Sequence, residues 1–147
     1  MGIDLANLTD RQLQMMPNAE RKKLGKRAVT AAEALHVETS RLERKIHDQF
    51  TGFCDRYGID PWHSNPTRKS SIRAGYPDFL CVKNSRAVGI EFKIPPNKLS
   101  AVQEARFAEC RAHGNEVHVC EETAPGAAYR QATMILRQFF NLTLEAD

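Results

Sequence analysis

Residues 75–93 read GYPDFLCVKNSRAVGIEFK, and this stretch decides the fold. Segments 79–82 and 87–92 are apolar and rich in β-branched and aromatic residues, while the four residues between them have turn composition. The pattern predicts an antiparallel hairpin. If Lys83 pairs with Arg86, counting outward along both strands places Asp78 directly opposite Glu91.

The charged residues at the open end of this hairpin are expected to share one face. Glu91 and Lys93 lie two residues apart on one strand, so their side chains project to the same side, whereas Phe92 points into the core. Opposed side chains in an antiparallel pair have Cβ atoms about 5 Å apart, where like charges repel, so Asp78 and Glu91 together need a cation. Oxygen ligands suit Mg²⁺, which polarises a phosphodiester and activates water, while a nearby ammonium orients that water or offsets charge on the phosphate.

The same residues also have a purely structural interpretation. Asp78 can cap a turn, and Glu91 and Lys93 can form a pair on a solvent-facing strand. Against this interpretation, Glu91 interrupts the apolar segment GIEFK beside a strand that is apolar on both faces. Charge in such surroundings needs a partner, so the pattern favours a functional site.

Length and composition limit the architecture. The 147 residues suffice for one core, so we expect an N-terminal arm over 1–38, partly helical or flexible, and one domain over 39–147. The net charge of +3 suits an anionic partner. Without a membrane-length apolar run or a signal peptide, the chain is expected to be cytoplasmic and to contact no membrane. Four scattered cysteines indicate reduced thiols, and five histidines without an i,i+4 pair or HExxH argue against zinc.

The main domain is expected to begin with a helix over 40–56 that Gly58 terminates. Its apolar stripe consists of Leu42, Ile46, Phe50 and Phe53. Glu43 lies at the edge of this stripe, and two interpretations of it stay open. Its carboxylate can reach toward the sheet, or it can complete a capping box with Ser40.

A basic loop is predicted between an edge strand and the hairpin. Residues 59–65 fit an edge strand interrupted by Pro61. The loop that follows carries three cations: Arg68, Lys69 and Arg73. They either contact a phosphate backbone or only face solvent.

The segments after the hairpin complete a mixed sheet. Ser100 starts a helix to about residue 112, with an alanine stripe facing the sheet, and Gln103 stands at the capping-box position with both a structural and a functional interpretation. A strand over 116–120 follows by a right-handed crossover, which makes it parallel to its neighbour. A last helix covers about 125–140. The chain therefore predicts an α/β fold with a mixed sheet of about four strands flanked by helices, in the order αβββαβ.

In this order, the motifs GYPD, EFK and LSAVQ resemble the PD-(D/E)xK nuclease superfamily, and most closely its virus-type replication-repair nuclease (VRR-Nuc) domains. The resemblance covers roughly residues 40–121. It implies a restriction-endonuclease-like core and a Mg²⁺- or Mn²⁺-dependent endonuclease that hydrolyses phosphodiester bonds of DNA, often in branched structures. Free-standing members resemble Holliday-junction resolvases and act as homodimers, which implies a bacterial or phage-infected cell as the setting.

The resemblance also assigns roles by position. It implies five catalytic side chains: Asp78, Glu91, Lys93, Gln103 and Glu43. Asp78, Glu91 and Glu43 would be metal ligands, together with the backbone carbonyl of Phe92. Lys93 would position the attacking water or stabilise the transition state.

Lys98 joins the three cations of the basic loop as an expected DNA contact. Its segment IPPNK lacks the glycines that the family often carries there.

Two alternatives for function stay open beside this resemblance. A basic chain of this kind can also be a catalytically inactive DNA-binding module. Otherwise it can be a nuclease that acts on flaps or on a sequence-specific duplex.

Overall fold

The computed structural model describes residues 10–17, 31–64 and 74–143. The chain divides into two compact units, residues 1–42 and 43–147. The first unit contains the short helix α1 (Asp10–Met15), and helix α3 (Ala31–Arg56) runs across the boundary between the units. Among the described residues, every helix is too short or too polar to span a membrane.

Helix α3 begins nine residues before the predicted start at Ser40. The preceding residues, AAEALHVET, include alanine, leucine and glutamate and contain neither glycine nor proline, so nothing stops the helix from extending toward the N-terminus. Ser40 therefore lies inside the helix, so the predicted start is wrong and the capping-box interpretation of Glu43 is excluded. The predicted end is confirmed, because the helix stops at Arg56 and Gly58 adopts a left-handed conformation with φ of 62°.

The sheet has four strands in the spatial order β1-β2-β3-β4. Strands β1 (Asp60–His63), β2 (Phe79–Lys83) and β3 (Arg86–Lys93) pair antiparallel, and β4 (Glu116–Glu121) pairs parallel to β3. The predicted α/β fold with a mixed four-stranded sheet is thereby confirmed. Pro61 lies in β1 at the edge of the sheet, where a missing amide costs no internal ladder bond.

The predicted register of the hairpin is also confirmed. Lys83 pairs with Arg86, and the ladder continues to Phe79 opposite Ile90. The two turn residues, Asn84 and Ser85, have φ of 50° and 60°, which is the left-handed pair required by a two-residue hairpin turn that matches the strand twist.

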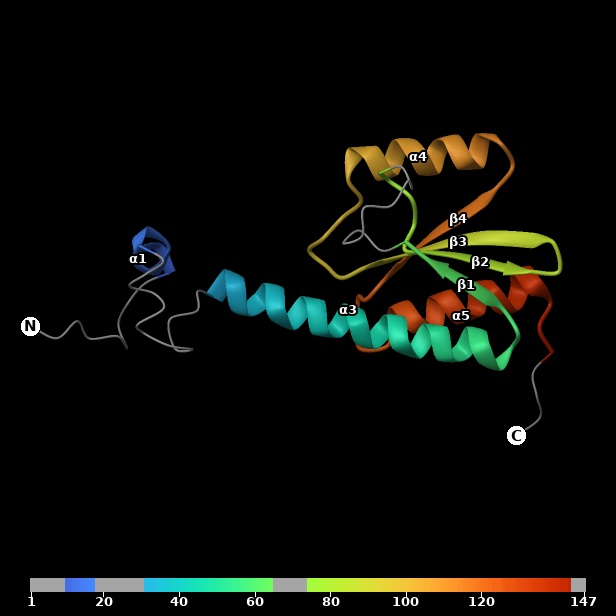
Figure 1. The fold of residues 1–147 in the computed structure, drawn as a ribbon, viewed down its shortest axis with the longest axis horizontal. Helices are drawn as coiled ribbons and strands as arrows, with labels where there is room; N and C mark the ends of the chain where they lie inside the picture. The colour runs from blue at the N-terminus through green and yellow to red at the C-terminus, as the bar shows by residue number, and fades with distance from the viewer. Residues whose placement is uncertain (1–9, 18–30, 65–73, 144–147) are drawn as a thin grey trace, which may run out of the picture. The chain divides into compact units, whose positions relative to one another are not determined.

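The helices cover the sheet on both faces, with α4 (Ala101–Ala112) on one side and α3 and α5 (Ala127–Phe140) on the other (Figure 1). The main core lies under α3 and α5. Its buried apolar side chains include Ile46, Phe50, Phe53, Phe79, Val88, Ile90, Phe92, Ala132 and Leu136. The Phe50 ring packs 5.0 Å from that of Phe79 and 5.2 Å from that of Phe92, measured between centroids, and these contacts fix α3 above the hairpin.

Helix α4 turns a different stripe to the sheet from the one predicted. Its alanines are exposed, and Phe107 is the side chain that is fully buried. Phe107 is flanked at helical spacing by the half-buried Gln103 and Cys110. Burying a phenylalanine gains more free energy than burying an alanine. Burial of Phe107 therefore orients the helix, and the alanines do not. All four cysteines of the chain are free thiols, as expected.

Candidate active site

The open end of the β2–β3 hairpin holds two carboxylates that each accept a hydrogen bond from the opposite strand. The Asp78 amide donates to Glu91 Oε2 over 2.9 Å, and the Phe92 amide donates to Asp78 Oδ2 over 2.8 Å. The last ladder pair is Phe79 opposite Ile90. Asp78 and Glu91 are the next residues outward on the two strands, so these two hydrogen bonds continue the predicted register by one position. The structure thus brings Asp78 and Glu91 together, as the sequence predicted.

Glu91 is buried among three donors. Its side chain is 2% exposed, and its Oε1 lies 2.8 Å from Lys93 Nζ and accepts a 2.7 Å hydrogen bond from Gln103 Nε2. Burial, and next the charge of Asp78, raise the pKa of Glu91, while Lys93 acts in the opposite direction. A carboxylate offers about four acceptor positions, so with these three donors Glu91 retains one on Oε2 for a further ligand.

Gln103 makes two sets of contacts, one with Ser100 at the start of α4 and one with Glu91. Gln103 Oε1 accepts a hydrogen bond from the backbone amide of Ser100 over 3.1 Å, and the backbone amide of Gln103 donates to Ser100 Oγ over 3.2 Å. These two bonds form the capping box of α4. The side-chain nitrogen remains free to donate to Glu91. The start of α4 is therefore tied directly to the buried carboxylate.

Asp78 also belongs to a second cluster, on the α3 side of the sheet. One ligand atom each from Glu43, His47 and Asp78 lie within 4.8 Å of one another. His47 Nε2 is 3.8 Å from Asp78 Oδ2, and it is buried without a hydrogen-bond partner among the described residues. The His47 ring is held by Phe79 and Phe92, at centroid distances of 5.0 and 5.5 Å.

His47 is the residue that the sequence analysis missed. The sequence signal for His47 is its i,i+4 spacing from Glu43, which places both side chains on one helix face. His63 at the end of β1 borders the same cluster, 5.2 Å from His47 between ring centroids. Its pKa is lowered by burial and then by His47, against the opposing charges of Asp78 and Glu43.

The Phe92 carbonyl faces the same side of β3 as the cluster. The amide of Phe92 donates to Asp78, and within one strand residue the N–H and C=O groups project to the same side. The carbonyl of the next residue, Lys93, accepts from Glu122 at the end of β4, on the opposite side of β3. The predicted role of the Phe92 carbonyl as a metal ligand is compatible with this orientation.

The predicted DNA contacts are placed only in part. Lys98 is exposed in the segment between β3 and α4. Arg68, Lys69 and Arg73 lie outside the described residues. The geometry of the basic loop therefore adds nothing to the site as described.

The residues at the hairpin end fit a divalent cation. Glu43, His47 and Asp78 offer two carboxylates and an imidazole nitrogen that lacks another partner. Adjacent donor atoms around one octahedral ion, at about 2.1 Å each, are roughly 3 Å apart, so His47 and Asp78, which are 3.8 Å apart, would have to move closer to bind one ion. A mixed nitrogen and oxygen donor set suits Mn²⁺ and other transition ions better than Mg²⁺, which prefers oxygen.

No protein-family model matches the chain, and no curated protein matches its sequence. A functional assignment therefore rests on the motifs and on the geometry of these side chains.

Proposed function

We propose that this protein is a metal-dependent endonuclease of the PD-(D/E)xK superfamily, of the VRR-Nuc type, which hydrolyses phosphodiester bonds in DNA. The observation that carries the proposal is the joint placement of Asp78, Glu91 and Lys93 at one hairpin end. The order αβββαβ, with an acid before β2 and an acid-x-lysine at the end of β3, supports a restriction-endonuclease-like core.

Each side chain has a distinct role in this proposal. Glu43, His47 and Asp78 would hold the cation, and Glu91, which lies outside that group, would offer the free acceptor position on Oε2 beside it. A divalent cation supplies Lewis acidity toward the phosphodiester. The ion pair with Glu91 keeps the Lys93 ammonium at the site, where it orients the attacking water or offsets charge that develops on the phosphate.

Gln103 acts as a positioning residue in the same scheme. Its hydrogen bond holds Glu91 Oε1 beside Lys93, so the carboxylate does not need to be reoriented during the reaction. Action on branched DNA by a homodimer, in the manner of Holliday-junction resolvases, belongs to the proposal through the motif resemblance. A two-fold symmetric dimer would present two such sites to opposed strands.

Cleavage of a labelled substrate panel tests the proposal. A four-way junction, a flap and a linear duplex are incubated with Mg²⁺, with Mn²⁺ or with EDTA. Cleavage is expected with either cation and none with EDTA, and both Asp78→Asn and Lys93→Ala should abolish it. Asp48→Asn, which changes an exposed acid on α3, is the matched control and should cut like the wild type. Wild-type cleavage by both site variants would contradict the assignment.

A further inference from the structure

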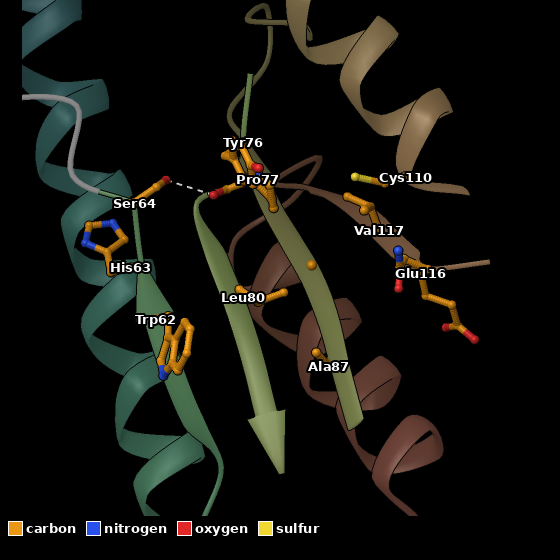
Figure 2. Close-up of a pocket in the computed structure, with 12 residues that line it drawn as sticks. Trp62, His63, Ser64, Tyr76, Pro77, Leu80, Ala87, Cys110, Glu116 and Val117 are labelled. Atoms are coloured by element: carbon orange, nitrogen blue, oxygen red, sulfur yellow. Dashed lines mark hydrogen bonds between the residues drawn. The ribbon is translucent and has the colours of Figure 1, made fainter. Parts of the chain in front are cut away.

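A cavity of about 750 Å³ lies on the face of the sheet that carries α4 (Figure 2). Helix α4 packs against β4, and no helix among the described residues has an equally extensive contact with β1 or β2 on this face. Three large apolar side chains of the cavity wall are unusually exposed: Trp62 at 59%, Tyr76 at 46% and Leu80 at 37%. Two small residues, Ala87 and Gly89, line the floor of the cavity. A concave site of this size and polarity is typical of a ligand pocket.

The cavity and the candidate active site share a wall. Ser64 Oγ donates to the Pro77 carbonyl over 2.8 Å, and the Ser64 amide donates to the Asp78 carbonyl over 2.9 Å. Ser64 and Pro77 line the cavity, and Pro77 directly precedes the metal-cluster residue Asp78. The cavity therefore opens next to the position proposed for phosphodiester hydrolysis.

Each aromatic side chain of the cavity wall has one polar or charged neighbour. Trp62 Nε1 donates to Asp60 Oδ2 over 2.8 Å, and Trp62 stands opposite Leu80 in the strand register, as Figure 2 shows. At the end nearer the site, the Arg106 guanidinium lies 5.9 Å from the centroid of the Tyr76 ring. Flat rings that are already ordered lose little entropy when another ring stacks on them.

The charged side chains at the two ends of the cavity are paired. Glu116 lines the end beside Val88, three residues along β3 from Glu91, and it pairs with His118 over 3.0 Å. Beyond the opposite end, toward the open end of the hairpin, Arg106 pairs with Glu109 and Lys93 pairs with Glu91, each over 2.8 Å. The mainly apolar lining between these pairs favours a flat apolar group in the middle of the cavity.

We propose that this cavity binds unpaired nucleobases of the DNA substrate, stacked on Trp62 and Tyr76, while the adjoining phosphate reaches the Asp78 and Lys93 site. The proposal rests on the proposed nuclease function and deepens it. Every base has a π-face that stacks on aromatic side chains, whereas bases inside an intact duplex already stack on one another and cannot enter. The substrate class is therefore DNA with a single-stranded segment beside the cut, such as a flap or an open branch point.

The single tryptophan of the chain makes the cavity directly observable, because all tryptophan fluorescence comes from Trp62. The full 147-residue chain is titrated in EDTA, where cleavage is excluded, with a ten-nucleotide single strand and with a blunt duplex of equal length. We expect the single strand to quench Trp62 and to bind at least about tenfold more tightly than the duplex. Equal binding of both without quenching would overturn the inference.

Variants then test the stacking. With a dye-labelled single strand, Trp62→Ala should weaken binding roughly 5- to 100-fold, while Trp62→Phe, which keeps a ring, should retain most of the affinity. Tyr76→Ala should weaken binding similarly and preserve the Trp62 signal. Met134→Ala is the matched control, since Met134 is 55% exposed on α5, outside the cavity, and it should bind like the wild type.

The two proposals fail separately. If the single strand quenches Trp62 but no substrate is cut with any divalent cation, the cavity assignment stands and the nuclease assignment is wrong. If flaps are cut and Trp62→Ala binds and cuts them as well as the wild type, the nuclease assignment stands and base stacking in this cavity is wrong. Quenching by lipid vesicles or by a protein partner, with none by DNA, would also overturn the base-binding role.

Discussion

Gln103 Nε2 donates a 2.7 Å hydrogen bond to Glu91 Oε1, which connects the capping box of α4 to the most deeply buried carboxylate of the site. One side chain therefore has a structural partner, Ser100, and a functional one, Glu91. Variants that remove one partner at a time can separate the two contributions.

Ser100→Ala is expected to remove the cap alone. It should lower the free energy of unfolding by about 1 kcal/mol and leave cleavage within about twofold of the wild type. Gln103→Ala loses the cap and also a hydrogen bond to a charged group, so it should destabilise by roughly 2 to 3 kcal/mol and reduce the cleavage rate by about tenfold or more. Denaturant unfolding and single-turnover cleavage measure the two effects. Equal loss of cleavage in both variants would show that Gln103 acts only through the cap.

Removing Lys93 should expose the cost of an unpaired buried carboxylate. Lys93→Ala leaves Glu91 without its cation and should destabilise the metal-free protein by roughly 3 kcal/mol. In the Lys93→Ala, Glu91→Gln double variant the buried charge is gone, so most of this stability should return while cleavage stays absent. A double-mutant cycle of unfolding free energies measures the coupling. Additive effects of the two substitutions would contradict the pairing.

The raised pKa of Glu91 predicts a particular pH dependence. Because burial disfavours the ionised form, the folded chain binds this proton more readily than the unfolded chain does. The raised pKa of Glu91 therefore adds to the free energy of unfolding at low pH. This contribution is fully present below the unfolded-state pKa of about 4.3, and it is lost as the pH rises through the higher pKa of Glu91 in the folded chain. Glu91→Gln cannot ionise, so without metal its stability relative to the wild type should increase over that pH range and then level off.

Chemical denaturation from pH 4 to pH 8 measures this difference. The control is Glu38→Gln, which changes an exposed glutamate on α3, and a pH trend of equal size in this variant would show that the trend does not come from Glu91. A constant difference for Glu91→Gln as well would mean that the pKa of Glu91 is not raised in the folded protein.

His47 should determine which cation the site prefers. Replacing a residue that only hydrogen-bonds to a metal ligand typically lowers metal affinity by about tenfold or more, and replacing a ligand itself should lower it at least as much. His47→Ala should therefore weaken Mn²⁺ binding by at least about tenfold. Because imidazole favours transition ions and carboxylate favours Mg²⁺, His47→Asp should narrow the preference for Mn²⁺ over Mg²⁺. Calorimetric titration gives both affinities. His118→Ala, at a histidine paired with Glu116 in β4, is the control, and unchanged Mn²⁺ affinity in His47→Ala would exclude His47 as a ligand.

The sequence predicted those features that depend on near neighbours in the chain. The register that places Asp78 opposite Glu91 follows from strand alternation and a short turn, and the capping box of Ser100 and Gln103 follows from a three-residue spacing. A local pattern gave a wrong prediction at Ser40, which resembled a helix cap although strong helix formers precede it.

The features that the sequence did not predict depend on packing between distant segments. His47 approaches Asp78 only because Phe50 docks α3 on Phe79 and Phe92. The orientation of α4 likewise follows from burial of Phe107, which the alanine pattern concealed. The sequence did not predict the aromatic cavity for the same reason, since Trp62 and Tyr76 come from either side of the basic loop and line one cavity only in the folded chain.

The left-handed turn at Asn84 and Ser85 has a consequence for how such a site can change during evolution. The turn fixes the pairing of β2 with β3. The number of residues between the turn and Asp78 therefore decides which residue of β3 lies opposite Asp78. A single insertion or deletion in β2 would leave a hairpin of the same composition but move Asp78 to the other side of the strand, away from Phe92 and His47. Substitutions can accumulate around this site gradually, whereas its spacing from the turn can change only if β3 changes by the same number of residues.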